Sequence, residues 1–310
     1  MRRTRLSGPL ILALTAFIWG TAFVAQSIGM RSIGPFTYTA FRSLFAVLIL
    51  FPFVALQDIY AKRRLTPEEK LKRKESKRLS LKSGFFIGLA LCLGANLQQF
   101  AFLYTSSGKI AFITALYMVI VPVLGIFLGK RVRFSLWIAV GVALAGLYLL
   151  SFTHGIAGVN FGDMLTLLSA FAFGVHILLI DRFAGKADPL LLSGVQFLVT
   201  GVISTAGMFI FESPSPAEIG AAIVPLLYSG VMSSGVAYTL QIVGQKNTEP
   251  TVASLIMCSE SVFGVLAAMV ILKEIPTLRE TAGIVLMLAA VILAQFSTRR
   301  DAPAQSASET

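Results

Sequence analysis

One carboxylate, Glu260, lies inside the apolar run 254–267, which reads SLIMCSESVFGVLA. The residue falls near the middle of a predicted membrane helix, where inserting an acidic side chain costs on the order of 3 kcal/mol. Two interpretations follow. In the first, Glu260 exchanges a proton or a cationic substrate as a cavity changes sides. In the second, it is a structural carboxyl that bonds neighbouring helices, with Arg42 as its candidate partner.

Five other predicted helices carry aromatic or polar side chains at helical spacing. They are Trp19, Phe23 and Gln26; Asn96 and Gln99; Thr114 and Tyr117; Phe173 and His176; and Ser234, Tyr238 and Gln241. Residues three, four or seven positions apart share one face of a helix. Because polar groups inside a bilayer face the protein interior, we predict that these residues line a cavity and bind substrate. Amide and aromatic groups there suit a small amphipathic or zwitterionic solute.

The alternative for each of these side chains is a hydrogen bond that holds two helices together. Pairs of small residues such as Gly84 and Gly88 indicate tight helix packing elsewhere in the chain. His176 has a further alternative, because an imidazole titrates near neutral pH and can relay protons. As a set, the stripes favour a cavity over packing contacts.

The composition places these stripes in a membrane protein. Hydrophobic residues make up 56% of the 310 residues and charged residues only 13%, whereas soluble domains carry roughly a quarter charged residues. The mean hydropathy is +0.80. The net charge of +11 does not indicate nucleic acid binding, because the basic residues lie in short stretches between hydrophobic runs.

Ten apolar runs approach the roughly 20 residues that cross a bilayer as a helix. The predicted spans are Pro9–Gly29, Pro35–Leu56, Gly84–Tyr104, Ile110–Leu128, Leu136–Phe152, Phe161–Ile180, Leu190–Phe211, Ala217–Gln241, Thr251–Leu272 and Thr277–Phe296. We interpret the first run as a retained helix and not a signal peptide, because no small-x-small cleavage site follows it. The sequence therefore predicts an all-α integral membrane protein with ten transmembrane helices.

Basic residues predict the orientation of this bundle. With the spans above, 21 of the 26 Lys and Arg residues lie on the side of the two chain ends, and Arg42 lies inside the second span. Only four lie in loops on the other side: Arg31, Lys109, Lys273 and Arg279. The positive-inside rule then makes residues 1–8 a cytoplasmic N-terminus and residues 298–310 a cytoplasmic, disordered tail. We expect a multi-pass protein of the bacterial inner membrane.

The segment 57–82 holds ten of the basic residues. It has two interpretations: an electrostatic contact with anionic lipid headgroups, or a cytoplasmic loop that fixes topology. The second is the more economical, since short basic cytoplasmic loops orient membrane proteins in general. We therefore predict a basic cytoplasmic loop.

The chain also repeats itself. A shift of 154 residues without a gap pairs Gly20 with Gly174, and a shift of about 142–144 farther along pairs Gln99 with Gln241. Each half thus holds five spans, in units 9–153 and 161–297. Because five is odd, the second unit starts on the opposite side of the membrane. Inverted repeats of this kind are typical of secondary transporters, with the substrate site near the midplane between the halves.

Three stretches resemble the EamA-like branch of the drug/metabolite transporter superfamily. They are WGTAFV (Trp19–Val24), AFRSLFAVLIL (Ala40–Leu50) and SESVFGVLAAMVILKE (Ser259–Glu274), and the resemblance spans residues 9–296. It implies a basket of helices around a central cavity, lined mainly by the first, third, fourth, sixth, eighth and ninth spans. Members of the family move small metabolites, often outward.

Three positions connect this chain to the family pattern or depart from it. Arg42 matches a recurrent arginine of the family, which we interpret as an anchor for topology or packing. Ser261 stands where the family usually has a proline after the glutamate, and Lys130 stands where it usually has an acidic residue.

These observations predict a secondary active transporter that exports a small metabolite, such as an amino acid or a related compound. One alternative is a proton-coupled importer or drug exporter that uses Glu260 and His176. Another, from a different class, is a receptor or scaffold that moves no solute. The expected partners are a small-molecule substrate and membrane lipid, without nucleic acid; the sequence specifies no oligomeric state.

Other classes lack their motifs. An enzyme of this kind would show HExxH, paired acids or a serine with a nearby base, but Asp163 and Asp181 lie at different depths from Glu260. The sequence also contains no Walker A motif, GxxxxGK[ST], so it does not indicate ATP-driven transport by this chain alone. Cys92 and Cys258 lie singly in apolar runs, outside any CxxC or Cys/His cluster, so neither a metal nor another cofactor is expected.

Overall fold

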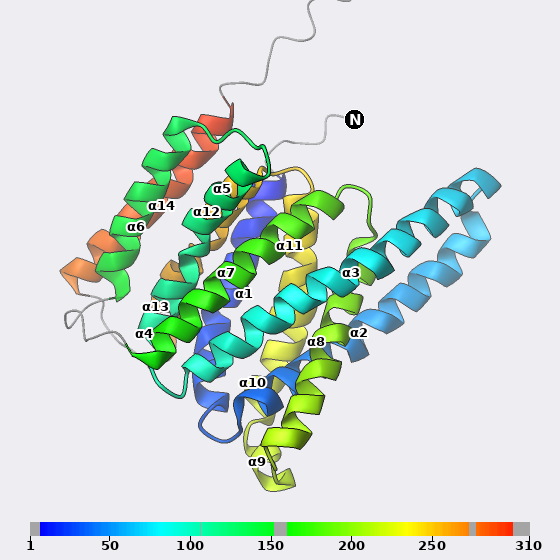
Figure 1. Cartoon of the computed structure of the whole chain (residues 1–310), viewed down its shortest axis with the longest axis horizontal. Helices are drawn as coiled ribbons and strands as arrows, with labels where there is room; N and C mark the ends of the chain where they lie inside the picture. The colour runs from blue at the N-terminus through cyan, green and yellow to red at the C-terminus, as the bar shows by residue number, and fades with distance from the viewer. Residues whose placement is uncertain (1–6, 106, 152–159, 273–276, 300–310) are drawn as a thin grey trace, which may run out of the picture.

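The computed structural model describes residues 7–105, 107–151, 160–272 and 277–299, and these residues form a bundle of helices without strands (Figure 1). Nine helical stretches within them are long and apolar enough to cross a membrane, and α6 is a shorter apolar helix. The predicted all-α membrane fold is confirmed.

The described helices and their bounds follow in chain order. They are α1 (Ser7–Gly29), α2 (Pro35–Arg64), α3 (Pro67–Ala101), α4 (Ser107–Ala115), α5 (Tyr117–Phe127), α6 (Phe134–Ser151), α7 (Phe161–Phe183), α8 (Pro189–Phe211), α9 (Pro216–Ala221), α10 (Ile223–Leu227), the π-helix η1 (Tyr228–Ala237), α11 (Tyr238–Gln245), α12 (Pro250–Met257), α13 (Glu260–Leu272) and α14 (Leu278–Arg299). The fourth, eighth and ninth predicted spans are therefore interrupted or altered helices, and the other spans are continuous within the described residues.

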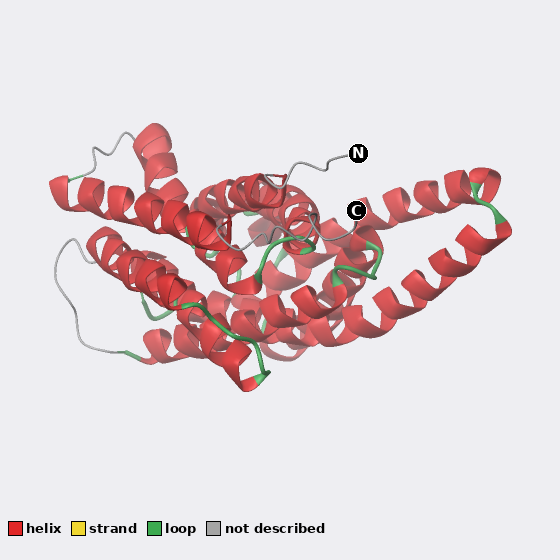
Figure 2. Cartoon of the chain, turned by 90° about the horizontal axis from the view of Figure 1, so that it is seen from above, coloured by secondary structure: helices red, strands yellow, loops and turns green. Residues whose placement is uncertain are grey.

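The segment 57–82, predicted as a loop, is helical, which corrects that prediction. α2 continues to Arg64 and α3 begins at Pro67, so the two helices form a hairpin that projects beyond the bundle (Figure 2). Thr66 and Glu69 start α3 with a capping box, in which the Thr66 amide donates to Glu69 Oε2 at 2.8 Å. Charged residues such as Lys, Arg and Glu are good helix formers in water, so both helices continue past the apolar part of their spans.

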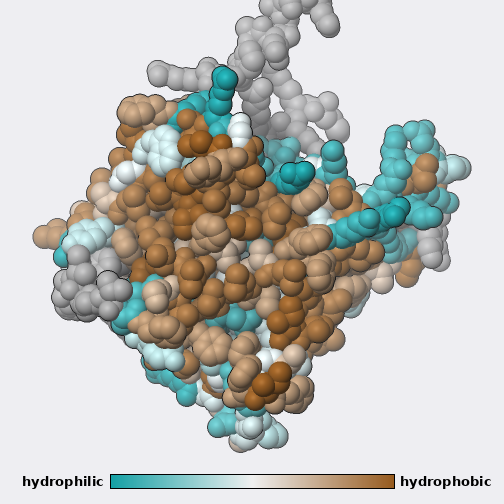
Figure 3. Space-filling model, viewed as in Figure 1, coloured by the Kyte–Doolittle hydropathy of each residue, from teal (hydrophilic) through white to brown (hydrophobic). Residues whose placement is uncertain are grey.

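The polar and apolar surfaces separate as a membrane protein requires. Hydrophobic side chains cover most of the face seen in Figure 3, and hydrophilic ones gather on the projecting hairpin and at the ends of the bundle. α1 begins and α14 ends at the same end of the bundle (Figure 1). Most of the predicted N-terminus (residues 1–6), most of the tail (300–310) and Lys273 lie outside the described residues.

The packing is reciprocal between the two predicted halves. α1, the first span of one half, packs against α12 and α13, the interrupted ninth span; α7, which opens the second half, packs against α4 and α5. Gly20 lets α1 approach α13 closely, because a Cβ there would lie 2.5 Å from the carbonyl oxygen of Glu260. A twofold relation between the halves would produce this pairing.

α6 and α14 form a second close pair through glycines. A Cβ placed on Gly146 would lie 2.9 Å from the carbonyl oxygen of Gly283, whereas nothing lies within 4 Å of a Cβ on Gly141 of the same helix. Small residues at such crossings let membrane helices approach and gain van der Waals contact.

We predict that Gly146→Val lowers stability by about 1–3 kcal/mol, because the larger side chain forces α6 away from α14. Gly141→Val is the matched control and should stay within about 0.5 kcal/mol of the wild type. Thermal unfolding of the purified protein in detergent measures both. Equal melting temperatures for the two variants would show that the glycine crossing does not hold α6 and α14 together.

Candidate functional site

A cavity lies near the middle of the bundle, where α1 and α7 meet η1, α11 and the interrupted helices. It offers about 50 Å³ to molecules the size of water. Nine of the twelve predicted substrate-binding residues line it: Trp19, Phe23, Gln26, Thr114, Tyr117, Phe173, His176, Tyr238 and Gln241. Glu260 lines it as well. The sequence analysis missed four other lining residues: Arg42, Gln98, Ile177 and Ser233.

Two helix interruptions place the central pair of side chains. Tyr117 begins α5 directly after the break at Leu116, and Glu260 begins α13 directly after the break at Cys258 and Ser259. The Tyr117 hydroxyl donates a hydrogen bond to Glu260 Oε1 at 3.3 Å, and both side chains are buried. Interrupted membrane helices often build the substrate site of transporters.

The interruptions have local causes in the sequence. Pro122 inside α5 lacks an amide hydrogen and so cannot donate to the carbonyl of Met118, two residues past the break at Leu116. Near the second break, the Ser259 hydroxyl donates to the Ile256 carbonyl at 2.6 Å, and Cys258 Sγ donates to the Leu255 carbonyl at 3.0 Å. Such side-chain bonds compete with the helical hydrogen bonds of the backbone.

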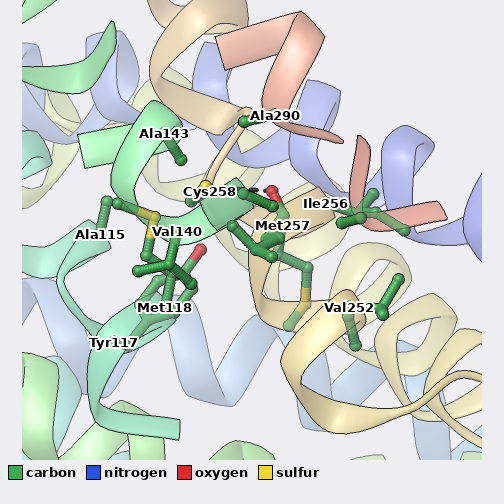
Figure 4. Packing of buried hydrophobic residues seen from close by; sticks show 14 of the residues in the cluster. Ala115, Tyr117, Met118, Val140, Ala143, Val252, Ile256, Met257, Cys258 and Ala290 are labelled. Carbon is green, nitrogen blue, oxygen red and sulfur yellow. Dashed lines mark hydrogen bonds between the residues drawn. The ribbon is translucent and has the colours of Figure 1, made fainter. Parts of the chain in front are cut away.

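An apolar cluster behind the cavity holds the interrupted helices in place. Figure 4 shows Tyr117 and Met118 of α5 beside Val140 of α6 and near Ile256 and Met257 of α12. Met118 and Met257 are fully buried. The breaks therefore sit on a packed base, which fixes the direction in which Tyr117 and Glu260 point.

Tyr238 is the aromatic centre of the cavity. Its ring centroid lies 4.7 Å from Trp19, 5.1 Å from Phe197 and 5.8 Å from His176. These rings come from α1, α8 and α7, so one tyrosine contacts both predicted halves. The arrangement gives the cavity an apolar wall that suits an aromatic or aliphatic group.

Several polar lining groups already have partners inside the protein. Gln98 Nε2 donates to Thr114 Oγ1 at 3.0 Å, and the Trp19 indole donates to the Ser233 carbonyl at 3.4 Å. His176 Nε2 and Gln196 Oε1 lie 2.9 Å apart. The Gln241 amide oxygen and Arg42 Nε have no hydrogen-bond partner in the described part of the chain.

Three predicted residues do not line the cavity: Asn96, Gln99 and Ser234. Asn96 Nδ2 donates to Ser204 Oγ at 2.9 Å, so it links α3 to α8 as an interhelical contact. Gln99 shares that face of α3 and is fully buried, while its neighbour Gln98 faces the cavity. The three-residue spacing of Asn96 and Gln99 identified a polar face of α3, but the side chain of α3 that lines the cavity is Gln98.

Ser234 lies away from the cavity for a different reason, which is the π-helix η1. A π-helix bonds residues five positions apart, where an α-helix bonds residues four apart. The cavity-lining pair is Ser233 and Tyr238, which are five apart, whereas α-helical spacing from Tyr238 selects Ser234. A π-helix has no clear sequence signature, and π-segments often occur at functional sites.

Lining residues also occur in pairs related by the predicted repeat. A shift of 154 residues relates Trp19 to Phe173, and a shift of 143 relates both Gln98 to Gln241 and Tyr117 to Glu260. The sequence analysis had paired Gln241 with Gln99. If a twofold axis relates the predicted halves, residues that the repeat pairs and that touch, as Tyr117 and Glu260 do, lie close to that axis.

Ion pairs join the fourth span to α7 on both sides of the cavity. At one end, in the Lys109 cluster, Lys109 Nζ lies 2.8 Å from Asp163 Oδ2, and Thr105 Oγ1 donates to Asp163 at 2.9 Å. At the other end, in the Lys130 cluster, Lys130 pairs with Asp181. The Asp163 side chain is only 8% exposed, so the Lys109 pair is shielded from solvent screening.

Glu249 and Arg133 complete the Lys130 cluster. Burial raises the pKa of Glu249, and the charges of Arg133 and Lys130 partly oppose that rise, while Asp181 adds to it. The cluster thus brings together the loop after α5, the end of α7 and the start of α12. It lies at the end of the bundle at which α1 begins.

Comparisons with known proteins identify the class. The EamA-like transporter family matches residues 6–152 and 160–296, one match for each half of the chain. An uncharacterized transporter of Archaeoglobus fulgidus is 32% identical over 292 residues, covering 93% of this chain and 86% of the relative. The uncharacterized transporter YwfM of Bacillus subtilis is 23% identical, covering 96% and 97%. A solved crystal structure has the same fold, with a TM-score of 0.78 at 18% identity over 96% of this chain and 99% of that one.

The chain is therefore a multi-pass membrane transporter and not an enzyme. It belongs to the EamA-like transporter family, which confirms the resemblance found in the sequence. Among the described residues, no group of three His, Cys, Asp or Glu side chains could hold a metal ion.

We predict that a cysteine at position 233 reacts with a small water-soluble thiol reagent at least about tenfold faster than a cysteine at 234. Ser233 lines the cavity and Ser234 does not, and the native cysteines are both buried, so the wild type sets the baseline. Labelling rates of Ser233→Cys and Ser234→Cys in liposomes measure the difference. Faster labelling at 234 would mean that the segment follows α-helical spacing.

Proposed function

We propose that this transporter moves a small metabolite by alternating access, as an exporter in a bacterial inner membrane with both chain ends in the cytoplasm. The solute is an amino acid or a related compound. The two five-helix halves have opposite orientations, and the cavity between them is the substrate site. The observation that carries the proposal is the position of the cavity, between two interrupted helices and lined by residues from both halves.

The closures at both ends support alternating access. The Lys109 cluster and the Lys130 cluster join the same two elements, the fourth span and α7, at opposite ends. If one cluster opens while the other stays paired, the cavity becomes accessible from a single side. Two alternative states of this kind are the requirement for a secondary transporter.

The proposed orientation in the membrane rests on the distribution of charge, and the proposed solute rests on the lining of the cavity. The excess of Lys and Arg on the side of the chain ends supports a cytoplasmic location for the Lys130 cluster. The aromatic wall of the cavity and its polar lining support a small amphipathic solute such as an amino acid. Outward transport is proposed because members of the EamA-like family often move small metabolites outward.

A proton-coupled importer or drug exporter is the second candidate, and one observation favours it. Glu260 and His176, both titratable, line the same cavity and are buried. Exchange of a proton at Glu260 during the change of access would couple flux to the proton gradient. A receptor or scaffold, the third candidate, would show no flux.

Counterflow of radiolabelled amino acids into liposomes that hold the purified protein tests the function. We predict counterflow above that of protein-free liposomes, and we predict that Glu260→Gln keeps it within about threefold, because a glutamine oxygen still accepts the Tyr117 hydrogen bond. Glu75→Gln, on the exposed hairpin, is the matched control. Absence of counterflow in the wild type would contradict transport; loss of only the gradient-driven component in Glu260→Gln would favour the proton-coupled candidate.

A charge exchange tests the closure. We predict that Lys130→Asp, which places like charges together, raises the labelling rate of a cysteine at position 233 by roughly fivefold, since a pair at the surface contributes up to about 1 kcal/mol. The double variant Lys130→Asp/Asp181→Lys restores the opposite charges and should restore the wild-type rate. If the single and double variants label alike, the Lys130 cluster does not control access.

A further inference from the structure

Arg42 stands out among the residues that line the cavity. It lies in α2, its side chain is 4% exposed, and it borders the same space as Trp19, Phe23 and Glu260. The sequence analysis interpreted it as an anchor for topology or packing. In the structure Arg42 is a buried cation on the wall of the cavity.

The polar contacts of Arg42 are few and neutral. Its Nη1 donates to Gln26 Oε1 at 3.3 Å, a long bond, and its guanidinium interacts with the Tyr238 hydroxyl. Nε has no hydrogen-bond partner among the described residues. A guanidinium carries five N–H donors, and the Nε–H donor is therefore available for a further hydrogen bond.

No ion pair between Arg42 and a carboxylate occurs in the described part of the chain. The acid of the cavity, Glu260, instead accepts the Tyr117 hydroxyl. By contrast, Lys109 and Lys130, at the two ends of the fourth span, each have an aspartate partner. A buried cation without a directly paired counterion is costly, so an anionic group of a bound solute would stabilise Arg42.

The shape and charge of the site select the anion. A planar guanidinium binds a carboxylate through two parallel N–H···O bonds. Arg42 is the only Lys or Arg that the structure places on the cavity wall, so it matches one negative charge better than the two of a phosphate monoester. The aromatic rings of Trp19 and Tyr238 lie beside it and suit an apolar group.

We propose that Arg42 binds the carboxylate of the transported solute, whose apolar part lies against Trp19 and Tyr238. This inference rests on the proposed function, because it assumes that the cavity is the substrate site. It narrows the substrate to small monocarboxylates with an apolar portion, among which amino acids with apolar side chains are one group.

Matched probes separate the carboxylate from the rest of the solute. The probes are L-phenylalanine, L-leucine and 3-phenylpropionate, each with its carboxamide as the uncharged partner. Binding to the purified protein is measured by calorimetry in detergent, and flux by counterflow in liposomes. We expect at least one acid to bind tenfold or more tightly than its amide, a difference that hydrogen bonds to a charged group supply.

Variants of Arg42 assign that difference to one residue. We expect Arg42→Gln to weaken binding of the acid to the level of its amide, and Arg42→Lys to lie between them, because lysine keeps the charge without the planar fork. Arg31→Gln, in the exposed turn after α1, is the control and should bind as the wild type does. Melting temperatures of all variants show whether the fold is retained.

The outcomes distinguish this inference from the proposed function. Binding that depends on Arg42 but gives no flux would support the carboxylate site and contradict transport. Flux that is equal for acids and amides, or unchanged in a folded Arg42→Gln variant, would leave transport standing and overturn the carboxylate site. The inference also fails if no acid in the set binds better than its amide.

Discussion

Polar groups inside a bilayer must find their partners within the protein, because the hydrocarbon supplies none. In this chain that constraint converges on the hydrogen bond between Tyr117 and Glu260. Each residue follows a helix break, and the breaks free the two side chains to meet across the predicted halves. The cavity, its aromatic wall and its unpaired Gln241 and Arg42 atoms are all arranged around this contact.

The same constraint explains why, among the described residues, the fourth span and α7 carry ion pairs near their ends and none between. The Lys130 pair is partly exposed and can reach headgroups and water when it separates, so opening it costs little. A charged pair at mid-depth would be far costlier to separate. The centre holds hydrogen bonds between neutral groups, such as Gln98 with Thr114, and no ion pair occurs there among the described residues.

Much of this architecture could be predicted from the sequence, because each element has a one-dimensional signal. Apolar length located the spans, and helical spacing placed Trp19, Phe23 and Gln26 on the cavity wall. The misses have physical causes. The π-helix changed the register at Ser233, and the orientation of α3 depends on Ser204, which is 108 residues from Asn96. Neither effect is visible in the local pattern.

Arg42 is a second case in which the local sequence does not determine the role of a residue. Its type was evident, but whether a membrane arginine is a packing anchor or a binding group depends on what surrounds it. In the structure it faces the cavity and no carboxylate pairs with it within the described residues. Long-range placement, and not residue type, separates the two interpretations.

Alternating closure of the two clusters is the central claim, and paired distance measurements test it most directly. Spin labels at exposed Arg131 and Arg182 report on the Lys130 cluster, and labels at exposed Ser107 and Phe161 report on the Lys109 cluster. In liposomes with a transported solute, alternating closure lengthens one distance as it shortens the other. Two distances that stay constant, or that lengthen together, would contradict it.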